Sequence, residues 1–195
     1  MKRLTLLSVF IFLSLAIAFP VFAYDVIGDL DYVPQGSSVY IDNFEKGNYW
    51  IWASFDWEQW GPPKLSTSAR ISTQWASEEK NSLECKVRES FAGSDLSGMF
   101  YMDHRWDFSG ANYIVFDVYN PEDVPFGFSM SFQTSDNWDW NETSYVAINP
   151  GKHTVVLSTK QFTNALSLVY RINICYHEST PLEGHFFVDN MRFIK

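Results

Sequence analysis

Basic residues are scarce in this 195-residue chain, which carries 14 Lys and Arg against 23 Asp and Glu. The formal net charge of −9 leaves no basic patch to release counterions from phosphate, so we expect no nucleic acid and no anionic membrane as partner. The same charge does not disfavour neutral polymers. After residue 19 no apolar run approaches the roughly 20 residues that cross a bilayer, so we predict no membrane span in the mature chain.

The usual catalytic motifs are also missing. The sequence contains no Gly-x-Ser-x-Gly, no His-Glu-x-x-His and no Cys and His spacing typical of zinc, and its four histidines are scattered. A small jelly-roll glycoside hydrolase remains an alternative, with carboxylates drawn from Glu58, Glu84, Asp117, Glu142 and Glu178. A lyase would instead use Arg171, Tyr176 and His177. Neither alternative has a recognisable signature.

Cysteine is limited to Cys85 and Cys175. Cys85 shares the apolar phase of its segment, whereas Cys175 shares the phase of Arg171 and Asn173, so the two side chains are expected on different faces. A disulfide between them is left open.

The N-terminus begins with Lys2 and Arg3, continues through an apolar stretch at 4–19 and reaches Ala23. This pattern predicts a signal peptide at 1–23, cleaved after Ala23, and therefore a secreted or periplasmic protein. Residues 24–38 contain Gly, Pro and Asp without a sustained period, which predicts an irregular N-terminal arm.

From Val39 onward, short segments rich in β-branched and aromatic residues alternate with turn residues. Helical periodicity is limited to a weak turn at 159–166, and the connection from Trp50 to Asn81 is long and rich in Trp. We therefore predict an all-β fold over 39–195, a two-sheet antiparallel β-sandwich of the jelly-roll kind. The expected strands are 39–44, 82–87, 98–102, 112–120, 126–134, 144–149, 153–158, 170–176 and 185–194.

The stretch TSDNWDWNETS at 134–144 places Trp138 and Trp140 among acids and amides. If residues 137–141 continue a strand, both indoles project from one face and form an apolar platform. The C–H face of a sugar ring stacks on such a platform, while its hydroxyls need polar partners. The alternative is that both indoles cap the end of the core.

Polar positions on neighbouring strands complete this hypothesis. Gln133 ends the small and polar face of 126–134, and Arg171 and Asn173 alternate on another strand, so all three are expected to contact a glycan. Tyr101 and Trp106 are second choices as stacking platforms.

Four segments, 41–50, 106–121, 148–158 and 184–194, resemble successive strands of carbohydrate-binding modules with the galactose-binding-like β-jelly-roll fold. This resemblance implies a concave sheet that carries a glycan groove, and a structural Ca²⁺ that joins the first strand to the last. The matching positions are Glu45 and Asp189, with Asp42 a weaker candidate. Hard carboxylate oxygens suit calcium, although Asp42 and Asp189 could instead bond backbone amides in turns.

Such modules are usually joined to a glycosidase, and this sequence suggests no second domain. We therefore expect a non-catalytic polysaccharide binder that acts alone or beside separate glycan-degrading enzymes. A structural or protein-interaction sandwich of the cell envelope, with the Trp-rich loop at 50–75 as its contact surface, is the remaining alternative. The sugar itself is left open, because stacking tolerates many pyranoses.

Overall fold

The computed structural model describes residues 24–47, 49–54, 68–87, 97–177 and 184–195. The predicted signal peptide lies outside these residues, as do Trp57, Glu58, Trp60 and Glu178. Within the described segments, no helix is long and apolar enough to cross a membrane.

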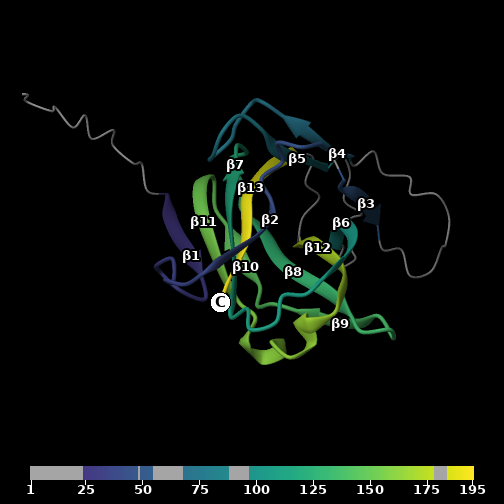
Figure 1. Cartoon of the computed structure of the whole chain (residues 1–195). Helices are drawn as coiled ribbons and strands as arrows, with labels where there is room; N and C mark the ends of the chain where they lie inside the picture. The colour runs from purple at the N-terminus through teal and green to yellow at the C-terminus, as the bar shows by residue number, and fades with distance from the viewer. Residues whose placement is uncertain (1–23, 48, 55–67, 88–96, 178–183) are drawn as a thin grey trace, which may run out of the picture.

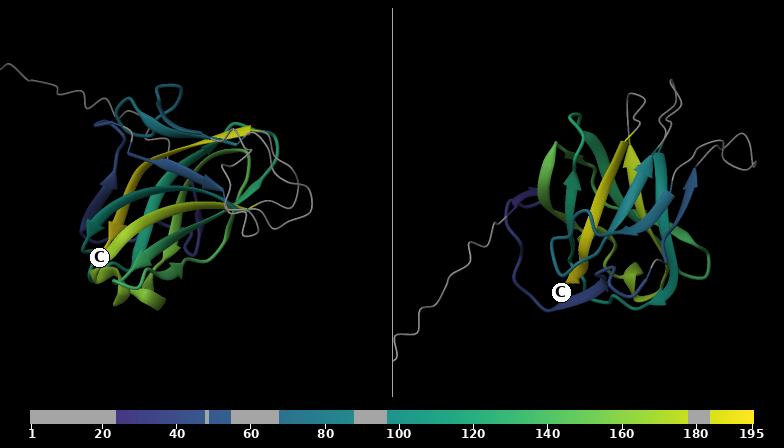
Figure 2. Two further views of the ribbon diagram at one scale, coloured as in Figure 1. Left: turned by 90° about the vertical axis from the view of Figure 1, so that its right-hand side faces the viewer. Right: turned by 90° about the horizontal axis from the view of Figure 1, so that it is seen from above.

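The described chain folds into two β-sheets packed face to face (Figures 1 and 2). One of them, which we call the β13 sheet, has the order β1 (Asp25–Gly28), β11 (Gly151–Ser158), β7 (Tyr113–Asn120), β13 (Gly184–Ile194), β5 (Ser82–Val87) and β4 (Ser68–Ser72), with β2 (Ser38–Asp42) also beside β13. The other, the β8 sheet, has the order β10 (Val146–Ile148), β8 (Phe126–Thr134), β12 (Val169–His177), β6 (Ser97–Trp106) and β3 (Ile51–Ser54), with β9 (Asp139–Glu142) also beside β8. This arrangement confirms the predicted two-sheet β-sandwich.

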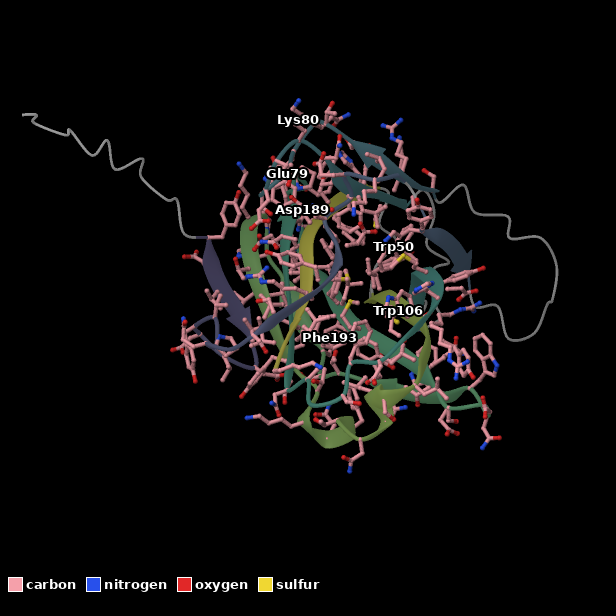
Figure 3. The ribbon with its side chains drawn as sticks, in the orientation of Figure 1. Trp50, Glu79, Lys80, Trp106, Asp189 and Phe193 are labelled. Atoms are coloured by element: carbon pink, nitrogen blue, oxygen red, sulfur yellow. The ribbon has the colours of Figure 1, made fainter. Side chains whose placement is uncertain are left out.

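Alternating apolar positions build the core between the sheets. Phe128, Met130 and Phe132 on β8 are fully buried, because every second side chain of that strand points inward. Phe193 on β13 meets Phe132 from the opposite sheet with ring centroids 5.5 Å apart, and Figure 3 shows it in the middle of the sandwich. Phe108 packs on Phe193 at 4.3 Å. The apolar phase read from the sequence therefore faces the core.

The prediction of an irregular N-terminal arm is wrong for residues 25–28. This segment forms β1, which pairs in parallel with β11, an exception to the otherwise antiparallel pairing of the described strands. A Cβ on Gly28 would lie 2.3 Å from the Val156 carbonyl oxygen, so only glycine allows this close approach. Asp29 then fixes the arm by accepting hydrogen bonds from the Ser158 amide (2.6 Å) and the Ser144 hydroxyl (2.7 Å).

Smaller expectations are met as well. The weak helical turn becomes two 3₁₀ turns, Lys160–Phe162 and Ala165–Ser167, which bury Phe162 and Leu166 against the core. Both cysteines are free and buried, with Cys85 in the core of the sandwich and Cys175 on the outer face of β12. Of the Trp-rich connection, the side chains of Trp50 and Trp75 are described, and both are buried.

Candidate functional site

The outer face of the β8 sheet brings together side chains from four strands. The register aligns Trp140 of β9 with Gln133 of β8, Gln133 with Arg171 of β12, and Arg171 with Asp103 of β6. Side chains at paired positions point to the same face, so these four residues form one row across the sheet. A second row on the same face lies two residues away along each strand and contains Glu142, Ser131, Asn173 and Tyr101.

Trp138 reaches this face from a turn, so the prediction of a strand at 137–141 is wrong at its start. Ser135 and Trp138 both have a φ of 60°, in the left-handed region, and β9 begins only at Asp139. Hydrogen bonds hold the turn: the Ser135 hydroxyl donates to Asp139 (2.6 Å), and the Asn137 amide donates to the Ser135 hydroxyl (3.1 Å). The indole consequently leans across the sheet instead of following the strand alternation.

The ring of Trp138 stacks on Tyr170, with centroids 5.6 Å apart and planes 21° apart. Tyr170 is in turn held by a 2.5 Å hydrogen bond from its hydroxyl to Asp136, a bond that raises the pKa of Tyr170. Trp138 remains 47% exposed and Trp140 44% exposed, so both indoles keep a wet surface. Neither is a buried core residue, which disfavours the alternative that the pair caps the core.

Arg171 lies at the centre of the first row. Its guanidinium donates two hydrogen bonds to Asp103, at 2.5 and 2.8 Å, and this bonding raises the pKa of Arg171. The guanidinium carbon also lies 3.9 Å from the centroid of the Tyr101 ring and 5.4 Å from that of Trp138. Such a clamped, planar cation is pre-organised to donate to ligand oxygens with its remaining N–H groups. The same contact covers part of Tyr101, so this ring supports Arg171 and is less suited to be a sugar platform.

Gln133 and Asn173 each carry a buried side-chain oxygen. Among the residues that the structure describes, neither Gln133 Oε1 nor Asn173 Oδ1 has a hydrogen-bond partner. Asn173 is fully buried and donates to the carbonyl and hydroxyl oxygens of Ser131, at 3.3 and 3.0 Å. Burial places the Asn173 amide in the floor of the face, and its contact with a glycan stays a prediction. Unpartnered acceptors are energetically unfavourable and favour the entry of hydroxyl or water donors.

Trp140 is oriented by a carboxylate that the sequence did not mark as a binding residue. Its indole Nε1 donates to Glu142 Oε2 at 2.9 Å, and the other Glu142 oxygen accepts a 2.5 Å bond from the Ser129 hydroxyl. Glu142 therefore bridges the exposed indole and the strand beneath it, which holds the ring in one orientation.

Trp106 lies elsewhere. It is half-buried against the core, stacks on Phe108 at 5.9 Å and contacts His104 edge to face. Trp106 lies four residues after the core residue Met102 on β6 and pairs with the buried Val169, so it shares the inward phase of the strand and points away from the outer face. Trp106 therefore does not belong to the outer face, and its role as a stacking platform stays a prediction.

The three predicted calcium ligands do not form one site. Asp42 accepts hydrogen bonds from the Phe44 amide (2.7 Å) and the Trp50 indole (3.1 Å), and burial raises the pKa of Asp42. Within the described part of the chain, no three His, Cys, Asp or Glu side chains are grouped so that they could hold a metal. Asp42 thus serves as a local hydrogen-bond acceptor, which is the alternative expected from the sequence.

Glu45 and Asp189 both bind the connection between β4 and β5, near Lys80 in Figure 3. Glu45 accepts from the amides of Lys80 (2.9 Å) and Asn81 (2.7 Å), and these bonds lower its pKa. Asp189 accepts from the amides of Ser77 (2.7 Å) and Glu78 (3.0 Å), while burial raises its pKa.

One oxygen beside Asp189 fits a cation. Asn190 Oδ1 is buried without a partner, while Asn190 Nδ2 donates to Glu78 (2.9 Å) and Asp117 (3.2 Å). An amide oxygen near carboxylates is a ligand type that calcium accepts, so the region around Asp189 fits the ion in chemistry.

Three residues of the outer face were missed from the sequence as binding candidates: Asp103, Tyr170 and Glu142. Tyr170 shares the apolar phase of β12, but a bulge between Val169 and Arg171 interrupts the pairing with both neighbouring strands. A bulge rotates the strand locally, which allows Tyr170 to meet Trp138. The cluster of acidic residues in TSDNWDWNE was a sequence signal that could have indicated Glu142. No sequence pattern indicated the bulge at Tyr170.

Solved structures share this fold. A family 11 carbohydrate-binding module from Clostridium thermocellum, in complex with a β-1,3-1,4-mixed-linked tetrasaccharide, aligns with a TM-score of 0.60 and 14% identity over 83% of this chain and 97% of that chain. A family 28 module specific for non-crystalline cellulose aligns with a TM-score of 0.59 and 20% identity, over 83% and 97%. A C. thermocellum xylanase 10B fragment with family 22 and family 10 hydrolase modules, complexed with xylohexaose, aligns at 0.55 and 15%, over 83% and 29%.

These similarities establish that the chain has the β-sandwich fold of carbohydrate-binding modules, as its sequence resemblance predicts. No family model matches the sequence, and a search of curated proteins finds no significant match.

Proposed function

We propose that this chain binds a neutral polysaccharide without cleaving it, on the outer face of the β8 sheet. The observation that carries this proposal is the juxtaposition of two half-exposed indoles, Trp138 and Trp140, with the clamped Arg171 and the unpartnered oxygen of Gln133. Indoles stack on the C–H faces of pyranose rings, while Arg171 donates to hydroxyl oxygens and Gln133 accepts from hydroxyl groups.

The proposed affinity follows from the size of this surface. A few stacked rings with a small number of hydrogen bonds correspond to dissociation constants on the order of millimolar to micromolar, or roughly 4 to 8 kcal/mol. Such weak binding suits a module that holds a long chain at several points, where avidity adds to each contact.

The described carboxylates support binding over catalysis. Glu84 and Asp117 lie on the β13 sheet, where Glu84 pairs with Arg70 at 2.7 Å and Asp117 accepts a hydrogen bond from Thr154 at 2.7 Å. Glu142 lies on the outer face of the β8 sheet, where it bonds Trp140. A retaining glycosidase needs two carboxyl groups about 5 to 5.5 Å apart across its groove, and of these three candidates Glu142 alone lies on the outer face of the β8 sheet.

The test is electrophoresis of the purified chain in native gels that contain mixed-linked β-glucan, xylan, mannan or galactose-rich polymers. We expect retardation by at least one polymer, and its loss in the Trp138→Ala/Trp140→Ala variant. Tyr32→Ala is the matched control, because Tyr32 is 57% exposed but lies in the N-terminal arm. The same mixtures are assayed for new reducing ends. Retardation without new ends supports a binding protein, new ends identify an enzyme, and no retardation by any polymer contradicts the proposal.

Two accompanying proposals concern export and calcium. The leader at 1–23 directs the chain out of the cytoplasm, so that the protein meets polysaccharide in the periplasm or outside the cell, beside separate glycan-degrading enzymes. A calcium ion at Asp189, with Asn190 Oδ1 and Glu45 as further ligands, joins the middle of β13 to the turn after β2 and to the β4–β5 connection. Mass determination of the mature protein and thermal unfolding with and without EDTA test these two proposals.

A further inference from the structure

A cavity lies at one edge of the sandwich, where, within the described part of the chain, one strand of each sheet has no neighbour on one side. Over the described residues, β2 pairs with β13 alone, and β6 pairs with β3 only as far as Tyr101. The free edges of β2 and of Asp103–Trp106 therefore face a cleft of about 530 Å³ (Trp106 is labelled in Figure 3). We call this cavity the edge cleft. Its volume falls in the range of about 300 to 1,000 Å³ that is typical of ligand sites.

The edge cleft combines an apolar floor with exposed aromatic walls. Ile41 and Met102 form the floor, and both pack against the core of the sandwich. Tyr40 and Tyr49 line the walls and are 57% and 63% exposed, far more than core packing would leave them. Exposed rings beside a cavity are available to stack on a flat ligand.

Polar groups of both signs line the rest of the cleft. The basic residues Lys46 and His104, the acidic residues Asp42 and Asp103, and the amide of Asn43 all line the cleft. Asp103 is already neutralised by Arg171, and Asp42 is held by the Phe44 amide and the Trp50 indole. This mixture gives little preference for an anion or a cation, whereas a neutral polyol finds both donors and acceptors.

Asp103 connects the edge cleft to the outer face of the β8 sheet. Asp103 lines the cleft, and its carboxylate accepts hydrogen bonds from the guanidinium of Arg171 at 2.5 and 2.8 Å. The two sites therefore adjoin at one residue, and a chain bound on the outer face has a neighbouring cavity for a branch or an end.

We infer that the edge cleft is a second glycan site, which takes one neutral pyranose unit from a side branch or chain end by stacking on Tyr40 and Tyr49. The inference rests on the proposed function only for the class of ligand. A pocket closed by a floor suits a terminal unit, while the open row of Trp140, Gln133 and Arg171 suits the interior of a chain.

Amide NMR titration separates the two sites. The probes are a mixed-linked β-glucan tetrasaccharide, xylohexaose and a galactosyl-branched mannan oligosaccharide, added to the parent, to Tyr40→Ala/Tyr49→Ala and to Trp138→Ala/Trp140→Ala. For at least one probe, we expect saturable shifts at Asn43 and His104 in the parent. The tyrosine variant should weaken these shifts at least tenfold and keep those at Gln133, and the tryptophan variant should do the reverse. Unchanged thermal unfolding of the tyrosine variant checks its fold.

Each other outcome decides the inference. Shifts confined to Gln133 and its neighbours overturn the edge cleft and leave the proposed function standing. Shifts at Asn43 and His104 that disappear in the tryptophan variant also overturn it, because they are then transmitted through Asp103. Shifts at the cleft alone support the second site and contradict the proposed one, and no shift with any probe overturns both.

Discussion

Replacing Trp138 by Ala separates a binding role from a core role. Trp138 is 47% exposed, so about half of its side chain is already in water. A fully covered Trp buries about 150 to 250 Å² of surface. Because Trp138 is only about half covered, its replacement by Ala removes about 100 Å² of buried apolar contact. At about 25 cal/mol per Å² this corresponds to at most about 2.5 kcal/mol, and a compact unfolded state lowers the figure to about 1.5.

For a chain of this size, each kcal/mol lowers the melting temperature by about 2 to 4 °C, so we expect a decrease of roughly 3 to 10 °C. Binding should weaken at least tenfold, which is about 1.4 kcal/mol, because one of the two exposed indoles is removed. Differential scanning calorimetry measures the first quantity, and isothermal titration with the polymer that retards the parent measures the second.

Two controls bracket this result. Phe132→Ala removes a fully buried ring and should destabilise by about 3 to 5 kcal/mol, whereas Tyr32→Ala removes an exposed ring of the N-terminal arm. If Trp138→Ala destabilises as much as Phe132→Ala, the indole is a structural residue. If it leaves the affinity unchanged, the reasoning from exposure and stacking is refuted.

Three further predictions concern charged groups. Asp103→Asn releases Arg171 from its two hydrogen bonds. We expect a loss of stability of up to about 1 kcal/mol, since both groups are partly exposed, and at least a fivefold loss of glycan affinity. An unchanged affinity would contradict the role of Asp103 in holding Arg171. Calcium at about 100 times its dissociation constant should stabilise the parent by about 2.7 kcal/mol, measured as a rise in melting temperature that EDTA reverses and that is absent in Asp189→Asn; no rise in the parent removes the metal. Burial raises the pKa of Asp42 above the value near 3.9 of an unfolded chain, so the folded state retains this proton to higher pH. The parent should therefore gain stability relative to Asp42→Asn as the pH falls from about 7 towards 4. A difference in unfolding free energy between the two proteins that stays constant across that range would rule this out.

Local alternation explains how far the sequence alone could predict the fold. Phe126, Phe128, Met130 and Phe132 repeat with a period of two, and the strand at 126–134 has the expected bounds. A period of two is a property of neighbouring residues, because an extended backbone sends successive side chains to opposite faces. Most strands, the two-sheet architecture and the face that carries Arg171 follow from it, whereas β1, β3 and β4 were not expected as strands.

The site depended on contacts between distant parts of the chain. The bulge at Tyr170 is defined by the pairing of β12 with β8 and β6, since the register shifts between Val169 and Arg171 against both strands. Asp103 meets Arg171 only through the register between β6 and β12. Trp138 reaches the face through a residue with positive φ, which no alternation pattern encodes.

Burial was likewise decided by the tertiary structure. Asn173 has the phase of an outward-facing polar residue, yet the folded chain buries it completely against Ser131. The edge cleft, too, arises because β2 and β6 belong to different sheets and, among the strands that the structure describes, neither has a neighbour on that side. Periodicity assigns a side chain to a face, but its exposure depends on what the rest of the chain packs above that face. The sequence by itself therefore determined the sandwich and its faces, and only the tertiary structure decided which polar groups remain open to a ligand.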